Sequence, residues 1–237
     1  MYCWNRLMRK NQAQAPRDAG LQSQRKSFME KASSTKPSTR RTFTDYLRFW
    51  FKWVLDPLGG FFNRLGMTPN MMTMVGLVGN TVGAYFLSQG EMLTGGLLVA
   101  LMTPIDALDG TMARLRGEAS DWGAYVDSVS DRYAELIIFS GLLYHFLGRG
   151  DTLGGMLTFA AAAGSVLVSY VKARAEGLGY DAKVGLLTRA ERYIVLAPSL
   201  IFHQLYLGLG ILAVFANLTA LQRVWYVRRF ARGKLKQ

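Results

Sequence analysis

Four aspartates stand in otherwise apolar sequence between residues 106 and 131. Asp106 and Asp109 are three residues apart, and Asp127 and Asp131 are four residues apart. Because residues at these spacings share one face of a helix, each pair is expected to project from a single helix. If the two helices fold back on each other, the four carboxylates converge and repel unless a cation joins them. An all-oxygen set favours Mg2+, Mn2+ or Ca2+ over zinc.

The alternative for these acids is a structural network of Asp–Arg pairs made with Arg114 and Arg132. Four acids outnumber these local partners, which favours a metal. Arg114 is also suited to bind a phosphate through paired N–H donors. Gly110 and Ala113 lie on the same helix face and are small, so either a ligand or a neighbouring helix can approach there. Metal and arginine beside an apolar phase suggest a diphosphate ligand.

Composition indicates a membrane protein. The chain has 237 residues, of which 50% are hydrophobic, with a formal net charge of +12 and a pI of about 10.0. Such a charge suggests nucleic acid or an anionic membrane surface as partner. Long apolar runs favour the lipid bilayer, and no nucleic-acid motif is present, so no nucleic-acid partner is expected. Cys3 is the single cysteine, which excludes an intramolecular disulfide.

The two ends of the chain differ from its apolar body. Residues 1–41 are polar and basic, and we expect a disordered cytoplasmic tail beside anionic lipid. A cleavable signal peptide is not expected, because no apolar region follows the first basic residues. Residues 42–66 predict an amphipathic helix in the membrane interface, broken or kinked near Pro57 and Gly59–Gly60. Residues 231–237 predict a basic C-terminal tail.

Residues 67–230 predict an all-α, polytopic membrane domain. Six spans are expected at 71–89, 92–113, 125–147, 153–175, 190–206 and 208–227, each near the ~20 residues that cross a bilayer. The last two are short and closely joined, so a re-entrant pair is the alternative. Basic residues concentrate in alternate loops and at the C-terminus. The positive-inside rule therefore places both termini and the aspartates at the cytoplasmic face of the cell membrane, where buried acids are costly and usually functional.

The acidic stretch resembles a known signature. Asp106-x2-Asp109-Gly110-x2-Ala113-Arg114-x8-Gly123-x3-Asp127-x3-Asp131 is similar at every position to that of the CDP-alcohol phosphotransferases. The resemblance covers residues 42–230. It implies a six-helix membrane enzyme, usually a homodimer, in which an acceptor hydroxyl displaces CMP from a CDP-linked lipid or alcohol.

The resemblance also implies residue roles. The first three aspartates hold one or two Mg2+ or Mn2+ ions, and Asp131, also near the metal, is the catalytic base. The residues that border the CDP-lipid are Thr68, Pro69, Asn70, Thr73, Gly110, Ala113, Arg114, Ser120 and Gly123. By itself, Thr-Pro-Asn is only a plausible helix start. Glu135 continues the face of Asp127 and Asp131, and it either supports these acids or pairs with a basic group.

A second, basic constellation indicates the acceptor. It consists of SYVKARAEGLG at 169–179 and GLLTRAER at 185–192, and it fits either a topology signal or a pocket for an anionic acceptor. These two sequence motifs resemble those of the phosphatidylinositol-phosphate and archaetidylinositol-phosphate synthases. It implies CDP-diacylglycerol or CDP-archaeol as donor and inositol 1-phosphate as acceptor, with glycerol 3-phosphate as the alternative. Lys172, Arg189 and Arg192 would bind the acceptor phosphate, with Arg228 as a further candidate. Ala190 replaces a proline typical of that branch, which predicts a less fixed helix start.

Two other classes of protein are weighed against the enzyme. A small transporter or cation carrier also places acids in the membrane. Transporters usually carry internal repeats and midplane sites, whereas we find no convincing repeat and the acids lie near one membrane face. A membrane anchor without chemistry leaves the four acids unexplained.

Overall fold

The computed structural model describes residues 55–118, 120–182 and 184–234, and these residues form helices joined by short connections. The long helices are α3 (Pro69–Gln89), α4 (Met92–Arg116), α5 (Asp121–Gly148), α6 (Thr152–Gly177), α7 (Arg189–Ile201) and α8 (Leu205–Lys234). Residues 55–64 are also helical. The described residues contain no strand, which confirms the predicted all-α class.

Local sequence explains where the helices nearest the aspartates begin and end. The Thr68 hydroxyl accepts a hydrogen bond from Met71 N and Pro69 occupies the first turn, so Thr-Pro-Asn does start α3. Gly117 ends α4 in the left-handed conformation, with φ of 68°. The Ser120 hydroxyl then accepts from Gly123 N at 3.1 Å and starts α5.

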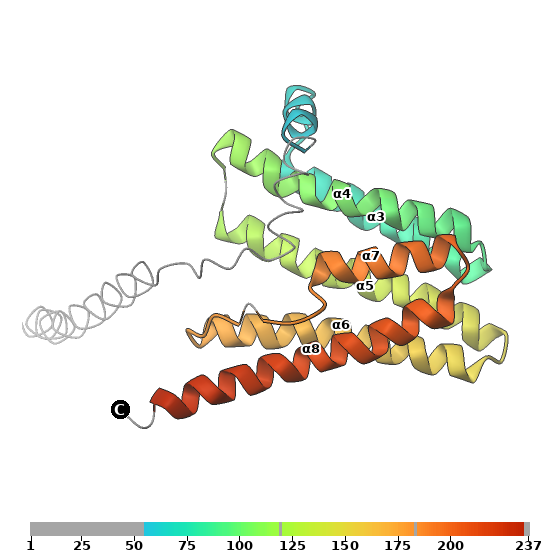
Figure 1. Ribbon diagram of the computed structural model, residues 1–237. Helices are drawn as coiled ribbons and strands as arrows, with labels where there is room; N and C mark the ends of the chain where they lie inside the picture. The colour runs from blue at the N-terminus through green and yellow to red at the C-terminus, as the bar shows by residue number, and fades with distance from the viewer. Residues whose placement is uncertain (1–54, 119, 183, 235–237) are drawn as a thin grey trace, which may run out of the picture. The chain divides into compact units, whose positions relative to one another are not determined.

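The helices pack in two pairs with others laid between them (Figure 1). Helix α3 packs along α4 and α5, and α6 packs along α8. Helix α5 also contacts α6, while α7 contacts α4 and α8. The largest cluster of buried apolar side chains draws on all six long helices. It includes Leu87, Val99, Ile138, Phe139, Leu142, Leu196, Leu200, Leu209 and Leu212. This packing brings the C-terminal half of α4 and the N-terminal half of α5 to α7.

Small residues allow the helices to approach closely, as in other membrane bundles. A Cβ added to Gly141 of α5 would stand 2.3 Å from Ala84 O of α3. A Cβ on Gly164 of α6 would stand 2.6 Å from the Asn217 amide nitrogen of α8. The Asn217 amide donates to Ala160 O at 3.0 Å, so α6 and α8 are joined by a partly buried hydrogen bond as well as by packing.

Four of the described helices are long and apolar enough to cross a membrane: Pro69–Gln89, Met92–Arg116, Thr152–Gly177 and Leu205–Arg232. Their outer faces expose large apolar side chains such as Val78 and Leu101, as expected of a surface that meets lipid. Helix α5 carries several charged residues. Helix α7 has 13 residues, which at ~1.5 Å per residue reach about 20 Å, less than the ~30 Å hydrocarbon core. By length and hydropathy, four of the six predicted spans are therefore supported among the described helices.

The predicted interfacial helix is described only in its last part. Residues 1–41 and 42–54 lie outside the described residues. Residues 55–64 form a continuous helix, so a break at Gly59–Gly60 was wrong, whereas a kink there stays a prediction. Gly59 instead serves close packing, because a Cβ there would lie 3.3 Å from Thr111 Cγ2 of α4. At the other end, residues 231–234 continue α8, and 235–237 lie outside the described residues.

Candidate active site

The four aspartates converge where α4 faces α5. Asp106 and Asp109 come from α4, Asp127 and Asp131 from α5. Asp106, Asp109 and Asp131 are buried, with 8%, 6% and 7% of their surface exposed, and Asp127 is half-buried. Asp106 interacts electrostatically with Asp109, Asp127 and Asp131, and Asp127 also interacts with Asp109 and Asp131. The predicted convergence of two helical pairs is therefore present in the fold.

Helix α3 supports the two acids of α4. The Thr73 hydroxyl donates to Asp109 Oδ2 at 2.6 Å, and Gly110 N donates to Asp109 Oδ1. Gly76 leaves the space in which Asp106 lies, because a Cβ on Gly76 would stand 1.8 Å from Asp106 Oδ1. The backbone of α3 thus forms one wall of the acid cluster.

Arg189, the first residue of α7, lies among the acids. Its Nη2 is 2.5 Å from Asp131 Oδ1 and 3.1 Å from Asp106 Oδ2. Its guanidinium lies 5.7 Å from the centre of the Tyr193 ring. One arginine from a helix far along the chain therefore bridges α4 and α5.

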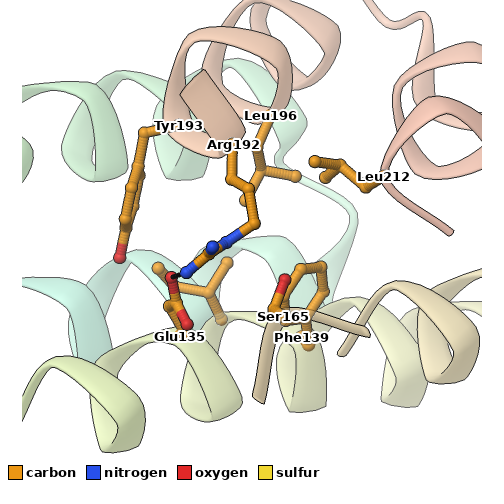
Figure 2. Close-up of a pocket in the computed structure, with 8 residues that line it drawn as sticks. Glu135, Phe139, Ser165, Arg192, Tyr193, Leu196 and Leu212 are labelled. Atoms are coloured by element: carbon orange, nitrogen blue, oxygen red, sulfur yellow. Dashed lines mark hydrogen bonds and ion pairs between the residues drawn. The ribbon is translucent and has the colours of Figure 1, made fainter. Parts of the chain in front are cut away.

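A second set of charges continues from Asp131 along α5. Arg132 Nη2 lies 3.4 Å from Asp131 Oδ2, and Arg132 Nε lies 3.8 Å from Glu135 Oε2. Arg192 of α7 donates to Glu135 Oε1 at 2.6 Å, and both side chains are almost fully buried. Figure 2 shows Arg192 reaching from its helix to Glu135 beside Phe139, Ser165 and Leu212, which line the same small pocket. Of the two roles weighed for Glu135, pairing with a basic group is confirmed.

The ion pairs of the acids differ from the Asp–Arg network that the sequence offered as the alternative to a metal. Arg132 does pair with Asp131, but Arg114 donates to Thr111 Oγ1 at 2.9 Å rather than to an aspartate. In that alternative network Arg114 was a partner, whereas the fold brings in Arg189, a residue 83 positions away from Asp106. The expected role of Arg114, binding a phosphate of the CDP-lipid, stays a prediction.

The charges and donors fit a divalent cation. Among the five carboxylates of this region, counting Glu135, only Asp106, Asp131 and Glu135 form ion pairs with the three guanidinium groups of Arg132, Arg189 and Arg192. Two negative charges are left without a partner in this set, and the donors are carboxylate oxygens, which hard cations prefer. Within the described residues, however, no three acidic, His or Cys side chains already stand close enough together to hold a metal ion. Metal binding by Asp106, Asp109, Asp127 and Asp131 stays a prediction.

The residues expected to border a CDP moiety include two glycines beside open space. A Cβ on Gly110 would meet no atom within 4 Å, and one on Gly123 would meet only Ser120 Oγ at 3.3 Å. Helix packing therefore does not require glycine at position 110. Arg114 and Ser120 are exposed and Ala113 is half-buried. Thr68, Pro69 and Asn70 begin α3, whereas Thr73 faces Asp109, so its side chain supports an acid.

The four basic residues of the expected acceptor pocket have different surroundings. Lys172 is partly exposed and lies 3.8 Å from Glu176, and Arg228 is exposed on α8. Arg189 contacts the acids, and Arg192 is buried against Glu135. The α7 start is well defined despite Ala190, because Thr188 and Glu191 form a capping box in place of the proline.

Two polar residues near this site were missed by sequence reasoning. Thr219 and Arg223 of α8 are buried, with 0% and 4% of their surface exposed. Both bind the backbone of the connection between α6 and α7. Their spacing of four residues on an apolar helix was the available signal, because it places both polar groups on one face.

The fold and the acid cluster define a class of helical membrane enzyme. The family model for CDP-alcohol phosphatidyltransferase matches residues 66–225, so the chain belongs to the CDP-alcohol phosphatidyltransferase family. This confirms the resemblance drawn from the aspartate signature, and it makes the protein a transferase of phospholipid synthesis.

Named relatives are found in bacteria and archaea. The phosphatidylinositol phosphate synthase of Streptomyces avermitilis is 38% identical over 200 residues, which cover 78% of this chain and 82% of the relative. The archaetidylinositol phosphate synthase of Pyrococcus horikoshii is 31% identical over 179 residues, which cover 75% of this chain and 93% of the relative.

Crystal structures of the phosphatidylinositol phosphate synthase of Mycobacterium tuberculosis have the same fold. The structure with CDP-DAG bound matches with a TM-score of 0.68 at 31% identity, covering 73% of this chain and 93% of that chain. The structure in complex with manganese and citrate matches with a TM-score of 0.66 at 30% identity, covering 73% of this chain and 88% of that chain.

Proposed function

We propose that this protein transfers the phosphatidyl group of CDP-diacylglycerol to a hydroxyl of inositol 1-phosphate and releases CMP. The observation that carries the proposal is the contact of Arg189, the first residue of the basic α7 segment, with Asp106 and Asp131 of the four signature aspartates. A cluster that binds cation and diphosphate thereby adjoins a cluster that binds an anionic acceptor. The named synthases in the family, one of which was crystallised with CDP-DAG, support these substrates.

Asp106, Asp109, Asp127 and Asp131 would hold one or two Mg2+ or Mn2+ ions. When bound, the cation would supply positive charge to the diphosphate and to the departing CMP. The manganese complex of the mycobacterial relative supports this cofactor. Gly110 and Gly123 leave open backbone beside the acids for the nucleotide, and Arg114 donates to its phosphates. Thr68, Pro69, Asn70, Thr73, Ala113 and Ser120 complete the CDP-lipid site.

Asp131 is the base of the reaction. Its carboxylate takes the proton of the acceptor hydroxyl as the hydroxyl oxygen bonds to the phosphatidyl phosphorus. The bond from that phosphorus to the CMP oxygen breaks, and CMP leaves with the electron pair. Arg189, Lys172, Arg192 and Arg228 orient the acceptor through its phosphate.

The protein acts in the cell membrane as a homodimer. Helices α3 to α8 lie in the bilayer as six spans, of which α7, with 13 residues, is short and closely joined to α8. Both termini and the active site face the cytoplasm. The basic residues at the ends of α4, α6 and α8 support this orientation. Residues 1–41 form a cytoplasmic tail and 42–66 an interfacial helix. Cysteine labelling from either side of the membrane tests the orientation.

An acceptor panel tests the reaction. Purified protein in lipid nanodiscs receives CDP-diacylglycerol, Mg2+ and one acceptor: inositol 1-phosphate, glycerol 3-phosphate or inositol. Lipid product and CMP are expected with inositol 1-phosphate, and a chelator is expected to abolish both. Product from glycerol 3-phosphate with none from inositol 1-phosphate would reject the inositol assignment. Absence of CMP release with every acceptor would reject the transferase, and a parallel series with CDP-archaeol identifies the preferred lipid.

A further inference from the structure

The hydroxyl of Thr219 attaches the connection between α6 and α7 to α8. Thr219 Oγ1 accepts hydrogen bonds from Leu187 N at 3.1 Å and from Leu186 N at 3.3 Å, and it donates to Phe215 O at 2.7 Å. A hydroxyl has one proton to donate and two lone pairs to accept. All three are used, so the side chain does more than the ordinary bond of a helical threonine to its own helix.

Arg223, one turn further along α8, holds the same connection and α6. Its Nε donates to Val184 O at 2.8 Å and its Nη1 donates to Val168 O at 2.7 Å. One buried guanidinium on α8 therefore binds both Val184 of the connection and Val168 of α6. Two of its N–H groups donate to backbone carbonyls, as expected of a side chain that fixes the position of the backbone.

Gly185 lets the connection lie against Thr219. Its φ is +139°, a conformation that side chains rarely adopt, and a Cβ there would stand 2.4 Å from Thr219 Cγ2. The close contact therefore depends on two residues: Thr219 of α8, which supplies the hydroxyl, and Gly185 of the connection, which has no side chain to obstruct it.

The attached segment leads directly into the active site. Leu187 is buried in the main core cluster, Thr188 caps α7, and Arg189 follows as the first residue of that helix. Only one residue separates the Leu187 amide from Arg189, whose guanidinium bridges Asp106 and Asp131. Release of the segment from α8 would free the start of α7 and move Arg189 relative to the acids.

We infer that Thr219 and Arg223 are positioning residues that dock residues 184–187 onto α8 and so place Arg189 at the acid cluster. The inference rests on the proposed function in its claim about the acceptor. Its structural part, the docking of the segment, does not depend on which acceptor is used.

The test compares Thr219→Val with Thr158→Val. Thr158 of α6 is equally buried and makes the same bond to its own helix, donating to Gly154 O at 2.7 Å, but no contact to the connection is shown for it. Thr219→Val is expected to speed hydrogen exchange at the Leu186 and Leu187 amides about fivefold, since a typical hydrogen bond is lost at each. It is also expected to raise the KM for the acceptor about fivefold, with the KM for the CDP-lipid unchanged. Thr219→Ser, which keeps the hydroxyl, should retain the wild-type exchange rates and acceptor KM, and Thr158→Val should change neither.

Gly185→Ala provides a second variant that keeps the hydroxyl. Its added Cβ should displace the segment and reproduce both effects of Thr219→Val. Gly179→Ala is its control, because Gly179 also has a positive φ, +79°, yet a Cβ there would meet no atom within 4 Å.

Unchanged exchange at Leu186 and Leu187 in Thr219→Val would overturn the docking. An equal rise in both KM values, or an equal effect of Thr158→Val, would overturn the positioning role. If the wild-type protein makes no lipid product, the proposed function fails, and amide exchange, which needs no substrate, still decides whether Thr219 docks the segment.

Discussion

Arg189 Nη2 lies 2.5 Å from Asp131 Oδ1, although the two residues come from different helices, α7 and α5. The same nitrogen is 3.1 Å from Asp106 Oδ2. One positive group therefore neutralises carboxylates that would otherwise repel across the α4–α5 contact. A divalent cation bound to the same oxygens would play the same part, so the arginine and the cation compete for them.

We predict that Arg189→Gln binds Mn2+ on the order of tenfold more tightly than the wild type, because removal of the guanidinium frees Asp106 and Asp131. Titration of the purified protein with Mn2+, followed by electron paramagnetic resonance, measures this without substrate. Arg174→Gln, at an exposed position in the last turn of α6, is the control. Weaker Mn2+ binding by Arg189→Gln would instead mean that Arg189 orients the carboxylates for the metal.

Asp131→Asn should lose turnover and keep most of its CDP-lipid binding. The amide cannot take the proton of the acceptor, and loss of a general base typically lowers kcat by about 10²–10⁴-fold. Initial rates of CMP release and equilibrium binding of labelled CDP-diacylglycerol measure the two properties separately. Asp121→Asn, at an exposed position in the first turn of α5, is the matched control. Equal loss of binding and turnover would contradict the assignment of Asp131 as base.

Gly76→Ala should damage the acid cluster from the α3 side. The new methyl group would stand 1.8 Å from Asp106 Oδ1, so either the carboxylate or α3 must move, and such overpacking typically costs about 1–3 kcal/mol. We expect a lower melting temperature and weaker Mn2+ binding. Gly60→Ala is the control, because a Cβ at position 60 would meet no atom within 4 Å. Normal Mn2+ binding by Gly76→Ala would show that Asp106 does not need its present position.

The Glu135–Arg192 pair separates a stabilising role from a role in acceptor binding. Arg192→Met leaves the buried Glu135 carboxylate with only the more distant Arg132, 3.8 Å away, and should lower the free energy of unfolding by about 3 kcal/mol. The double variant Glu135→Leu/Arg192→Met should recover most of this loss. Thermal unfolding in detergent measures both. If Arg192 also binds the acceptor phosphate, the double variant keeps a raised KM for the acceptor and a normal KM for the CDP-lipid. A normal acceptor KM in the double variant would assign Arg192 to stability alone.

Much of this protein was determined by sequence alone. Spacings of three and four residues put Asp106 with Asp109, and Asp127 with Asp131, on single helix faces, because local backbone geometry sets which side chains share a face. Long apolar runs determined the helical membrane class, since a bilayer leaves few other ways to satisfy the backbone. The aspartate signature also determined the family.

Only the tertiary structure decided which residues meet across helices. Sequence proximity offered only Arg114 and Arg132 as structural partners for the acids, but packing of α7 against α4 brings in Arg189. In the same way, Arg192 joins Glu135, and Thr219 joins a backbone segment more than 30 residues away. These contacts depend on how whole helices pack, which is the sum of many small, non-directional contacts. No local pattern of residues encodes them, so they became visible only in the folded chain.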